Sequence, residues 1–503
     1  MKENPIRAEH KSLEGYLKSV FTPAELSRPL IVNFNHWDFV QLAYADVAMT
    51  LHTLGSKVEL ALWANETPMR DIGWSSSRKV ARLLRSPSRE ENICRALIKG
   101  GINQSSFVQP PIKQWTPVDP IRLPQRLNRT SIRQMKYRGA DMGRAILQVH
   151  PDSETPVADS YEWPSQWVYV AARSFAFAFD QVSEIIKRNV ITSVVVYNGR
   201  FLHDRAAAAA AQQKAIPILS YDTGGSDTDF DLTVDETHDW SKLQSRMLSM
   251  YDNWDPSTRD HIGTTWFTDR QQHLDSANQA YTDAQKIGLS IEVPNNRCVV
   301  VFFSSSGDEI AELDLDWDEY FGTQDNALQV LGRQCKKIKD TYLVVRTHPH
   351  KRRKPKLDVA SWHETVRRID PDLHLDEYSD IDSYALMRQA DIVVTYGSTT
   401  GIEAAFAGKP VIVMGPSAYD QLGVAERVMN ESQLQEALSA PRGSDPRGAL
   451  AFGLMMTRRG FHYENVAKNN NFELNGIVLR DSNPLVLHIS DYIAKLARKR
   501  LLG

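Results

Sequence analysis

The sequence predicts an α/β protein with two Rossmann-like domains, each built on an open, parallel, doubly wound sheet. Short apolar runs typical of buried parallel strands alternate with segments of helical periodicity. This alternation occurs in two separate parts of the chain. The 503 residues also exceed what one compact core accommodates. We therefore expect two domains facing each other across a cleft.

The amino-terminal half carries two strand–helix–strand units. In chain order, the expected elements are a strand at 30–34, a helix at 39–54, strands at 57–63 and 193–197, a helix at 203–214 and a strand at 216–221. Asp38 is a suitable N-cap for the first helix, and Gly55 is suited to end it. The turn Asn198-Gly199-Arg200 follows one strand, and Asp222 follows the last.

The second half repeats the pattern. The expected strands are 298–303, 342–345, 391–395 and 410–414, with helices at 323–337, 383–389 and 401–407. We place the domain boundaries so that residues 1–288 form the first domain and 289–455 the second. Residues 456–503 are expected to be a helical segment that packs across both domains.

Composition excludes several classes of protein. Hydrophobic residues make up 42% and charged residues 24%, and the net charge of -3 gives no sign of nucleic-acid binding. No apolar run approaches the length of a membrane span, and the amino terminus MKENPIRAEH lacks a signal peptide's apolar core. We therefore expect a cytoplasmic protein. The basic helix expected at 489–502 either packs on the domains or contacts the inner membrane face peripherally. The three cysteines have no metal-ligand spacing and are expected to be free thiols.

The segment DIVVTYGSTTGIEAAFAGKPVIVMG carries the strongest functional signal. It predicts a buried strand that turns into a helix at Ser398, Thr399 and Thr400. Hydroxyl groups and free backbone N–H groups at such a turn suit a phosphate. Thr400 and Glu403 also fit a capping box, so the turn is either a phosphate site or an ordinary capped helix.

Two further strand ends are expected at the same edge of this sheet. Arg346-Thr347-His348-Pro349 follows one strand, and an Arg and a His there can bind phosphate. The cationic run 350–354 behind it is expected to be solvated. Ser305 lies in the Ser-rich turn after another strand, where its hydroxyl either contacts substrate or caps a helix.

These motifs together resemble the bacterial capsule and surface-polysaccharide glycosyltransferases of the GT-B fold. The resemblance covers the blocks between about residues 190 and 425, including FFSSSGDE, VVRTHPH and VVVYNGRFLHD. The His-Pro and Ser/Thr pairs are similar to those of sialyltransferases and Kdo transferases, which use CMP-sugars. The resemblance implies that His348, Ser398 and Thr399 hold the donor's phosphate. It also implies an acceptor-side first domain and a nucleotide-sugar-binding second domain.

An inverting transfer needs a general base for the acceptor hydroxyl. Asp222 is our first choice, although much of the family has Glu there, and His36 and Asp38 are alternatives. Asn198 and Arg200 would hold the acceptor or the donor's sugar. The resemblance gives Glu403 a second role, which is to bind the nucleotide ribose instead of capping the helix. No metal ion or other cofactor is expected.

The predicted function is an inverting glycosyltransferase that moves a sugar from a nucleotide sugar to a surface polysaccharide or glycolipid. A CMP-sugar such as CMP-Kdo is the favoured donor, and no nucleic acid is expected as a partner. Two other enzyme classes stay open: a CDP-polyol phosphotransferase of the teichoic-acid type and a UDP-sugar 2-epimerase-like enzyme. A nucleotide-binding regulatory protein is the non-enzymatic alternative.

Overall fold

The structure is a computed structural model that forms two compact units. It describes residues 12–35, 38–63, 89–108, 115–149, 160–234, 238–274, 282, 284–306, 312–313, 315, 320–468 and 471–479. The amino-terminal unit comprises the described residues between 12 and 234 together with 459–479. The central unit comprises those between 238 and 458. The central unit is therefore inserted into the chain of the amino-terminal unit.

The amino-terminal unit is built on a six-stranded sheet of order β14-β7-β6-β5-β1-β2. Its strands are β1 Pro29–Asn33, β2 Glu59–Leu62, β5 Ser193–Tyr197, β6 Ile218–Thr223, β7 Asp229–Val234 and β14 Phe461–His462. Strands β2, β1, β5 and β6 are parallel, whereas β7 and β14 pair antiparallel. The chain adds strands outward in both directions from the β1–β5 pair, so the strand order switches there.

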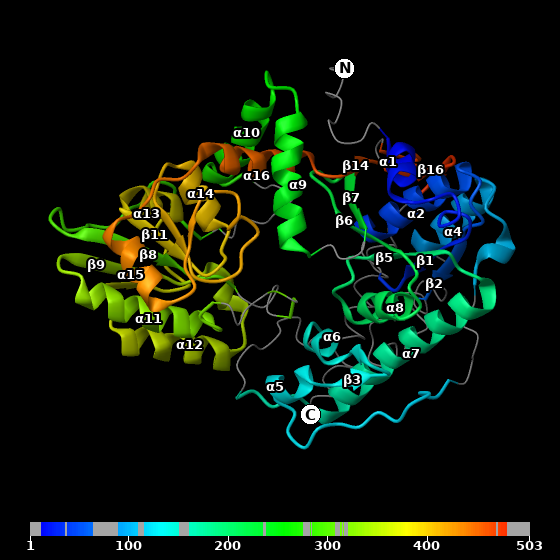
Figure 1. Ribbon diagram of the computed structural model, residues 1–503, viewed down its shortest axis with the longest axis horizontal. Coiled ribbons are helices and arrows are strands. Elements are labelled where there is room, and N and C mark those ends of the chain that lie inside the picture. The colour runs from blue at the N-terminus through cyan, green and yellow to red at the C-terminus, as the bar shows by residue number, and fades with distance from the viewer. Residues whose placement is uncertain are drawn as a thin grey trace. The chain divides into compact units, whose positions relative to one another are not determined.

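Helices cover both faces of this sheet (Figure 1). One face packs on α5 Arg129–Arg133, α6 Gly143–Leu147, α7 Ser165–Asn189 and α8 Leu202–Gln212. The other packs on α1 Leu13–Val20, α2 Asp38–Thr53 and α4 Arg89–Lys99. The remaining short elements are η2 Gln104–Ser106, β3 Lys136–Tyr137, β4 Ala140–Asp141, β15 Val466–Lys468, β16 Phe472–Leu474 and β17 Ile477–Val478.

The returning segment 459–479 is fastened to this unit by a buried carboxylate. Asp46 of α2 accepts hydrogen bonds from the backbone N–H groups of Glu464, Asn465 and Val466 at 3.2, 2.6 and 3.0 Å. Burial raises the pKa of Asp46 to about 6. The described part of the segment consists of short strands, where we expected helix. The basic helix expected at 489–502 lies outside the described residues, so membrane contact stays a prediction.

The central unit has a six-stranded sheet of order β10-β9-β8-β11-β12-β13. Its strands are β8 Cys298–Phe303, β9 Thr341–Arg346, β10 Leu373–Leu375, β11 Ile392–Thr395, β12 Val411–Val413 and β13 Glu426–Arg427. All neighbouring pairs are parallel. The chain moves outward from β8 through β9 to β10, and then continues on the other side from β11. The strand order therefore switches between β8 and β11.

Two helical layers enclose the central sheet (Figure 1). The first contains α9 Trp240–Asn253, α10 Arg259–Gln271, α13 Ser383–Gln389, α14 Thr400–Phe406 and α16 Pro446–Arg458. The second contains α11 Gln324–Lys337, α12 Lys356–Ile369 and α15 Glu431–Ser439. A 3-10 turn, η4 Pro349–Arg353, follows β9.

The fold class predicted from the sequence is confirmed, because each unit is a Rossmann-like α/β layer structure. The chain passes from one compact unit to the other near residues 238 and 458. The predicted domain boundaries lie at 288 and 455. Close packing of α10 on α16 accounts for the first difference. A Cβ on Gly453 would lie 2.1 Å from the carbonyl oxygen of Gly263, so the two backbones touch.

Candidate functional site

Three strand ends meet at one edge of the central sheet. Phe303 at the end of β8 is in register with Arg346 of β9 and with Thr395 of β11. The loops that follow these strands therefore begin side by side, at the point where the strand order switches. Ligands of open α/β sheets bind outside such strand ends. The predicted phosphate residues of three motifs are thus brought to one edge.

Ser304 joins two of these loops. Its backbone N–H donates to the carbonyl oxygen of Arg346 at 3.0 Å, and its Oγ accepts from the backbone N–H of His348 at 2.8 Å. Ser305, the predicted substrate residue, is held by the first residue of α11. The carboxamide oxygen of Gln324 accepts from the backbone N–H of Ser305 at 2.6 Å and from its hydroxyl at 3.2 Å. Ser305 therefore shapes this turn.

The imidazole of His348 has a defined tautomer. Its Nδ1 accepts a hydrogen bond of 3.1 Å from the backbone N–H of His350, so the proton of the neutral ring lies on Nε2. Burial, together with the neighbouring His350, Lys351, Arg346 and Lys354, lowers the pKa of His348 to about 3. His348 is therefore a neutral N–H donor at physiological pH.

The cationic run behind His348 is less exposed than its sequence predicts. His350, Lys351 and Lys354 are buried, whereas Arg352 and Arg353 are exposed. The ammonium of Lys351 lies 4.8 Å from the ring centroid of Trp362. Lys351 and Lys354 are three residues apart, and side chains at that spacing lie on the same side of a 3-10 turn such as η4. Positive charge is thus concentrated beside His348.

Arg346 does not present its guanidinium for a phosphate, which corrects the sequence-based expectation. The side chain is 2% exposed. Its Nη1 and Nη2 donate to the carbonyl oxygens of Asp376 and Ser379 at 2.7 and 3.2 Å. Burial lowers the pKa of Arg346 to about 10. The residue holds the loop after β10 in place and adds positive charge beneath His348.

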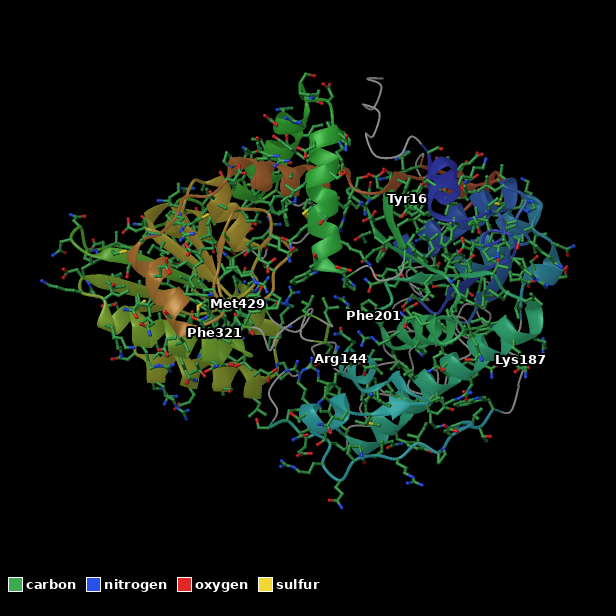
Figure 2. The ribbon with its side chains drawn as sticks, viewed as in Figure 1. Tyr16, Arg144, Lys187, Phe201, Phe321 and Met429 are labelled. Atoms are coloured by element: carbon green, nitrogen blue, oxygen red, sulfur yellow. The ribbon has the colours of Figure 1, made fainter. Side chains whose placement is uncertain are left out.

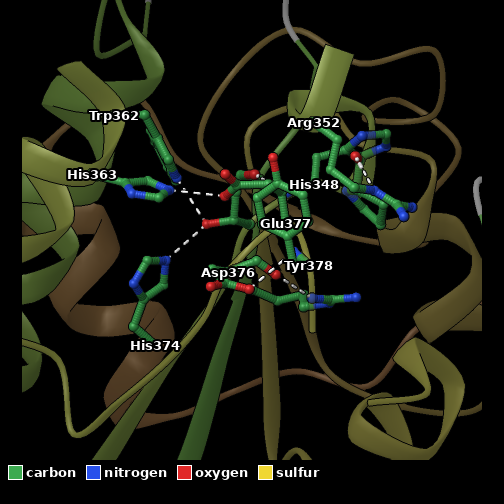
Figure 3. Close-up of polar contacts among 12 residues, drawn as sticks. His348, Arg352, Trp362, His363, His374, Asp376, Glu377 and Tyr378 are labelled. Atoms are coloured by element: carbon green, nitrogen blue, oxygen red, sulfur yellow. Dashed lines mark hydrogen bonds and ion pairs between the residues drawn. The ribbon is translucent and has the colours of Figure 1, made fainter. Parts of the chain in front are cut away.

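A buried polar network supports the loop that carries His348 (Figure 3). The hydroxyl of Thr347 contacts Nε2 of His374 at 2.9 Å and accepts from the indole N–H of Trp362 at 2.9 Å. Next to it, His363 Nε2 lies 2.8 Å from Oε2 of the buried Glu377. Thr347 is completely buried. These contacts fix the backbone from which His348 projects.

The side chain of Tyr419 holds the turn at Ser398–Thr400 by a hydrogen bond. The Tyr419 hydroxyl donates to the carbonyl oxygen of Ser398 and lies 3.1 Å from Thr395 Oγ1. Ser398 Oγ lies 3.2 Å from Thr400 Oγ1. Gly397 adopts a φ of 78°, which favours glycine. A Cβ on Gly401 would lie 2.2 Å from the Tyr419 hydroxyl, so Gly401 makes room for that tyrosine.

The predicted capping box is wrong. The N-cap residue of α14 is Thr399, whose side chain makes no capping hydrogen bond, and Thr400 is already helical. Glu403 Oε1 instead accepts from Arg270 Nε at 2.7 Å, and both side chains are buried. The Glu403 carboxylate therefore joins α14 to α10. This ion pair also argues against the ribose-binding role that the resemblance implied.

In the amino-terminal unit, the ends of β5 and β6 meet through their side chains. Asn198 Nδ2 donates to Asp222 Oδ2 at 2.7 Å, and the backbone N–H of Thr223 donates to Asp222 Oδ1 at 2.7 Å. Asn198 has a φ of 53°, in the left-handed region that Asn tolerates. The Arg200 guanidinium lies 4.7 Å from the ring centroid of Phe201. Phe201, which is labelled in Figure 2, directly precedes α8. The structure thus brings together three residues that the sequence singled out.

The charge state of Asp222 depends on opposing influences. Burial raises its pKa, while Arg459, the Thr223 N–H group and Arg200 lower it. Asp231 lies directly opposite on β7 and raises it further. A carboxylate whose pKa is raised by burial and lowered by nearby cations is suited to exchange a proton. The alternatives His36 and the Asp38 side chain lie outside the described residues.

One further acidic residue was missed from the sequence. Asp204 in the first turn of α8 is 1% exposed, and burial raises its pKa to about 7. Asn35 after β1 donates to its two oxygens at 3.1 and 3.4 Å. Beside it, the buried ring of His203 stacks on Phe34 with a centroid distance of 5.0 Å. The segment FLHDR carries no local sign of this burial.

Within the described residues, no three or more His, Cys, Asp or Glu side chains cluster as metal ligands do. Independence from metal ions stays a prediction. No helix in the described part of the chain is long and apolar enough to cross a membrane.

Comparison with solved structures gives loose likenesses. The first is a β-Kdo 2,4 transferase, KpsC of Thermosulfurimonas dismutans, with 15% identity, a TM-score of 0.34, and coverage of 52% of this chain and 78% of that chain. The β-Kdo 2,7 transferase of the same organism has 14% identity and a TM-score of 0.33, with coverage of 55% of this chain and 80% of that chain. MnaA of S. aureus with UDP has 11% identity and a TM-score of 0.25, with coverage of 93% of this chain and 97% of that chain. At these TM-scores, the likenesses carry no weight in the assignment.

The family comparison is more informative. A search of curated proteins gives no match. Residues 283–446, however, match the family model described as "Capsule polysaccharide biosynthesis protein". The matched range includes the three strand ends and the loops that carry Ser304, His348 and Ser398. The resemblance predicted from the sequence is confirmed for residues 283–446, which are similar to the capsule polysaccharide biosynthesis family.

Proposed function

We propose that this chain is a glycosyltransferase that moves a sugar, with inversion, from a CMP-sugar such as CMP-Kdo to a surface polysaccharide or glycolipid. The observation that carries the proposal is the register of three strand ends at the strand-order switch, from which the hydrogen-bonded Ser304 and His348 and the loop with Ser398 begin. The match of residues 283–446 to the capsule polysaccharide biosynthesis family model supports the same reaction class.

The central unit supplies the donor site. His348 offers its Nε2–H to a phosphate oxygen, and the hydroxyls of Ser398 and Thr399 lie in the loop after β11. The buried cations Lys351 and Lys354 add positive charge. Donors and positive charge at the phosphate stabilise the leaving nucleotide as the glycosidic bond breaks. None of these groups has to lose a proton for that purpose.

The amino-terminal unit supplies the acceptor side. Asp222 takes the proton of the acceptor hydroxyl as that oxygen attacks the sugar's anomeric carbon. Asn198 and the Thr223 N–H group hold the two carboxylate oxygens, which limits the rotation of the carboxylate. Arg200, in the turn after the neighbouring strand β5, supplies a cation for the acceptor or the donor sugar.

The preference for CMP depends on the His-Pro and Ser/Thr pairs, His348-Pro349 and Ser398-Thr399. Two other reactions use similar phosphate contacts. A CDP-polyol phosphotransferase would leave phosphate on the acceptor, and a UDP-sugar 2-epimerase would need no acceptor. Analysis of the products therefore separates the three reactions.

A thermal-shift screen of the whole chain with CMP, CDP, UDP and GDP tests the donor site. A nucleotide at 100 times its dissociation constant stabilises the folded state by about 2.7 kcal/mol. CMP should stabilise the wild type, and the Ser398→Ala/Thr399→Ala variant should lose that stabilisation. Ser432→Ala, an exposed serine of α15, is the matched control. The proposal fails if none of the four nucleotides stabilises the protein.

A further inference from the structure

The segment that returns the chain to the amino-terminal unit passes beside Asp222. Arg459 directly follows α16, which ends at Arg458. The backbone N–H of Gly225 donates to the carbonyl oxygen of Arg459 at 3.0 Å. Gly460 has a φ of 84°, and a Cβ there would lie 2.1 Å from the carbonyl oxygen of Phe230. The backbone of residues 459–460 is therefore held against the β6–β7 hairpin.

The side chain of Arg459 reaches the same strand end as the proposed base. Its Nη2 donates to Thr223 Oγ1 at 3.3 Å, and the N–H of Thr223 in turn donates to Asp222 Oδ1. Among the charged groups that lower the pKa of Asp222, Arg459 has the largest effect. Arg459 thus acts on Asp222 both through its charge and through Thr223.

The elements packed around Asp222 carry further groups that raise or lower its pKa. Arg200, in the turn after β5, also favours the ionised carboxylate. Asp231 on β7 and the burial of the site favour the protonated form. On β5, burial and then Asp222 itself raise the pKa of Tyr197, so that phenol stays neutral. Removing the cation at 459 would leave burial and Asp231 opposed by the Thr223 N–H group and Arg200.

We propose that Arg459 is a positioning residue that keeps Asp222 ionised and oriented for glycosyl transfer. The inference depends on the proposed role of Asp222 as the base. It has a structural consequence, because Arg459 belongs to the segment that joins the two compact units. Asp222 has the cation of Arg459 beside it only when this joining segment lies on the β6–β7 hairpin.

The pH profile of kcat/KM tests the proposal with three variants. Arg459→Met removes the charge, Arg459→Lys keeps it, and Lys468→Met removes another cation of the same segment that pairs with the exposed Asp227. The acidic limb should move up by about one pH unit or more in Arg459→Met. It should stay near the wild-type position in the other two variants. An equal loss of activity at every pH in Arg459→Met would overturn the proposal.

A second measurement does not require activity. The thermal midpoints of wild type and Arg459→Met should diverge as the pH rises from 4 to 8, because only the ionised Asp222 gains from the cation. In the Asp222→Asn background, the difference should not change with pH. A pH-independent difference in both backgrounds would contradict the inference. If this cycle succeeds while Asp222→Asn keeps its activity, the coupling stands and the role of Asp222 as the base fails.

Discussion

Asn198 donates a hydrogen bond of 2.7 Å to Asp222, which joins the carboxyl ends of β5 and β6. This contact fixes one carboxylate oxygen of the proposed base. Replacing Asp222 with Asn keeps the side-chain shape but removes the proton acceptor. We expect kcat to fall by about 100-fold or more, while stabilisation by the nucleotide stays at the wild-type level. Asp227→Asn in the same hairpin is the control, and full activity of Asp222→Asn would rule out its role as the base.

His348 is expected to bind the donor's phosphate as a neutral ring. Because burial and neighbouring cations lower its pKa to about 3, its charge does not change between pH 5.5 and 8. The affinity for the nucleotide should therefore show no histidine titration in this range, apart from that of the phosphate itself. His348→Ala should weaken nucleotide binding by about tenfold or more, since a hydrogen bond to a charged group is worth about 1.5 to 3 kcal/mol.

Titration calorimetry of the whole chain measures both effects. The exposed His261 of α10 provides the control variant His261→Ala, which should bind the nucleotide as the wild type does. Unchanged affinity in His348→Ala would show that the phosphate binds elsewhere.

The buried ion pair between Arg270 and Glu403 should contribute to stability. Removing one partner leaves the other charge buried without compensation, which costs about 3 to 5 kcal/mol. Arg270→Met and Glu403→Leu should each lower the denaturation midpoint of the protein strongly. The double variant should recover part of the loss, as a double-mutant cycle by chemical denaturation would measure. Glu403→Leu with unchanged stability and weaker nucleotide binding would instead support the ribose-binding role.

Gly401 and Tyr419 are predicted to be coupled sterically. In Gly401→Ala, the new Cβ would lie 2.2 Å from the Tyr419 hydroxyl. Overpacking of this kind costs about 1 to 3 kcal/mol. Tyr419→Phe removes the hydroxyl, so the double variant should be more stable than Gly401→Ala alone. Thermal denaturation tests this, and additive losses in the double variant would contradict the steric explanation.

Asp204 should make stability depend on pH. Its folded-state pKa of about 7 lies above its ordinary value, so the folded state holds the proton more tightly than the unfolded chain does. This contribution is fully present below about pH 4 and is lost as the pH rises through about 7, on the order of 4 kcal/mol in all. Asp204→Asn should flatten the decline in the denaturation midpoint between pH 5 and 8. The exposed Asp119→Asn should leave the decline unchanged, and a similar decline in Asp204→Asn would refute the assignment.

The central strands could be predicted from the sequence because buried parallel strands are short, nearly continuous apolar runs. The strand expected at 298–303 coincides with β8, and the strand expected at 193–197 coincides with β5. The 25-residue helix α7 was not predicted. Residues 174–182 in its middle are all buried, so the regular alternation of apolar and polar residues that marks a surface helix is interrupted there.

The destinations of individual side chains could not be predicted in the same way. Glu403 finds its partner Arg270 in a helix 133 positions earlier, and Arg346 binds carbonyl groups about 30 positions later. No local pattern encodes such distant contacts. By contrast, the pairing of Asn198 with Asp222 follows from the adjacency of β5 and β6, which the strand–helix–strand order predicts.

The most direct test of glycosyl transfer is analysis of the products by mass spectrometry. The purified chain would be incubated with CMP-, UDP- or GDP-linked sugars and a glycan or glycolipid acceptor. We predict release of CMP that requires the acceptor, together with an acceptor enlarged by one sugar and carrying no new phosphate. A phosphate left on the acceptor, or a nucleotide sugar that isomerises without any acceptor, would contradict the account.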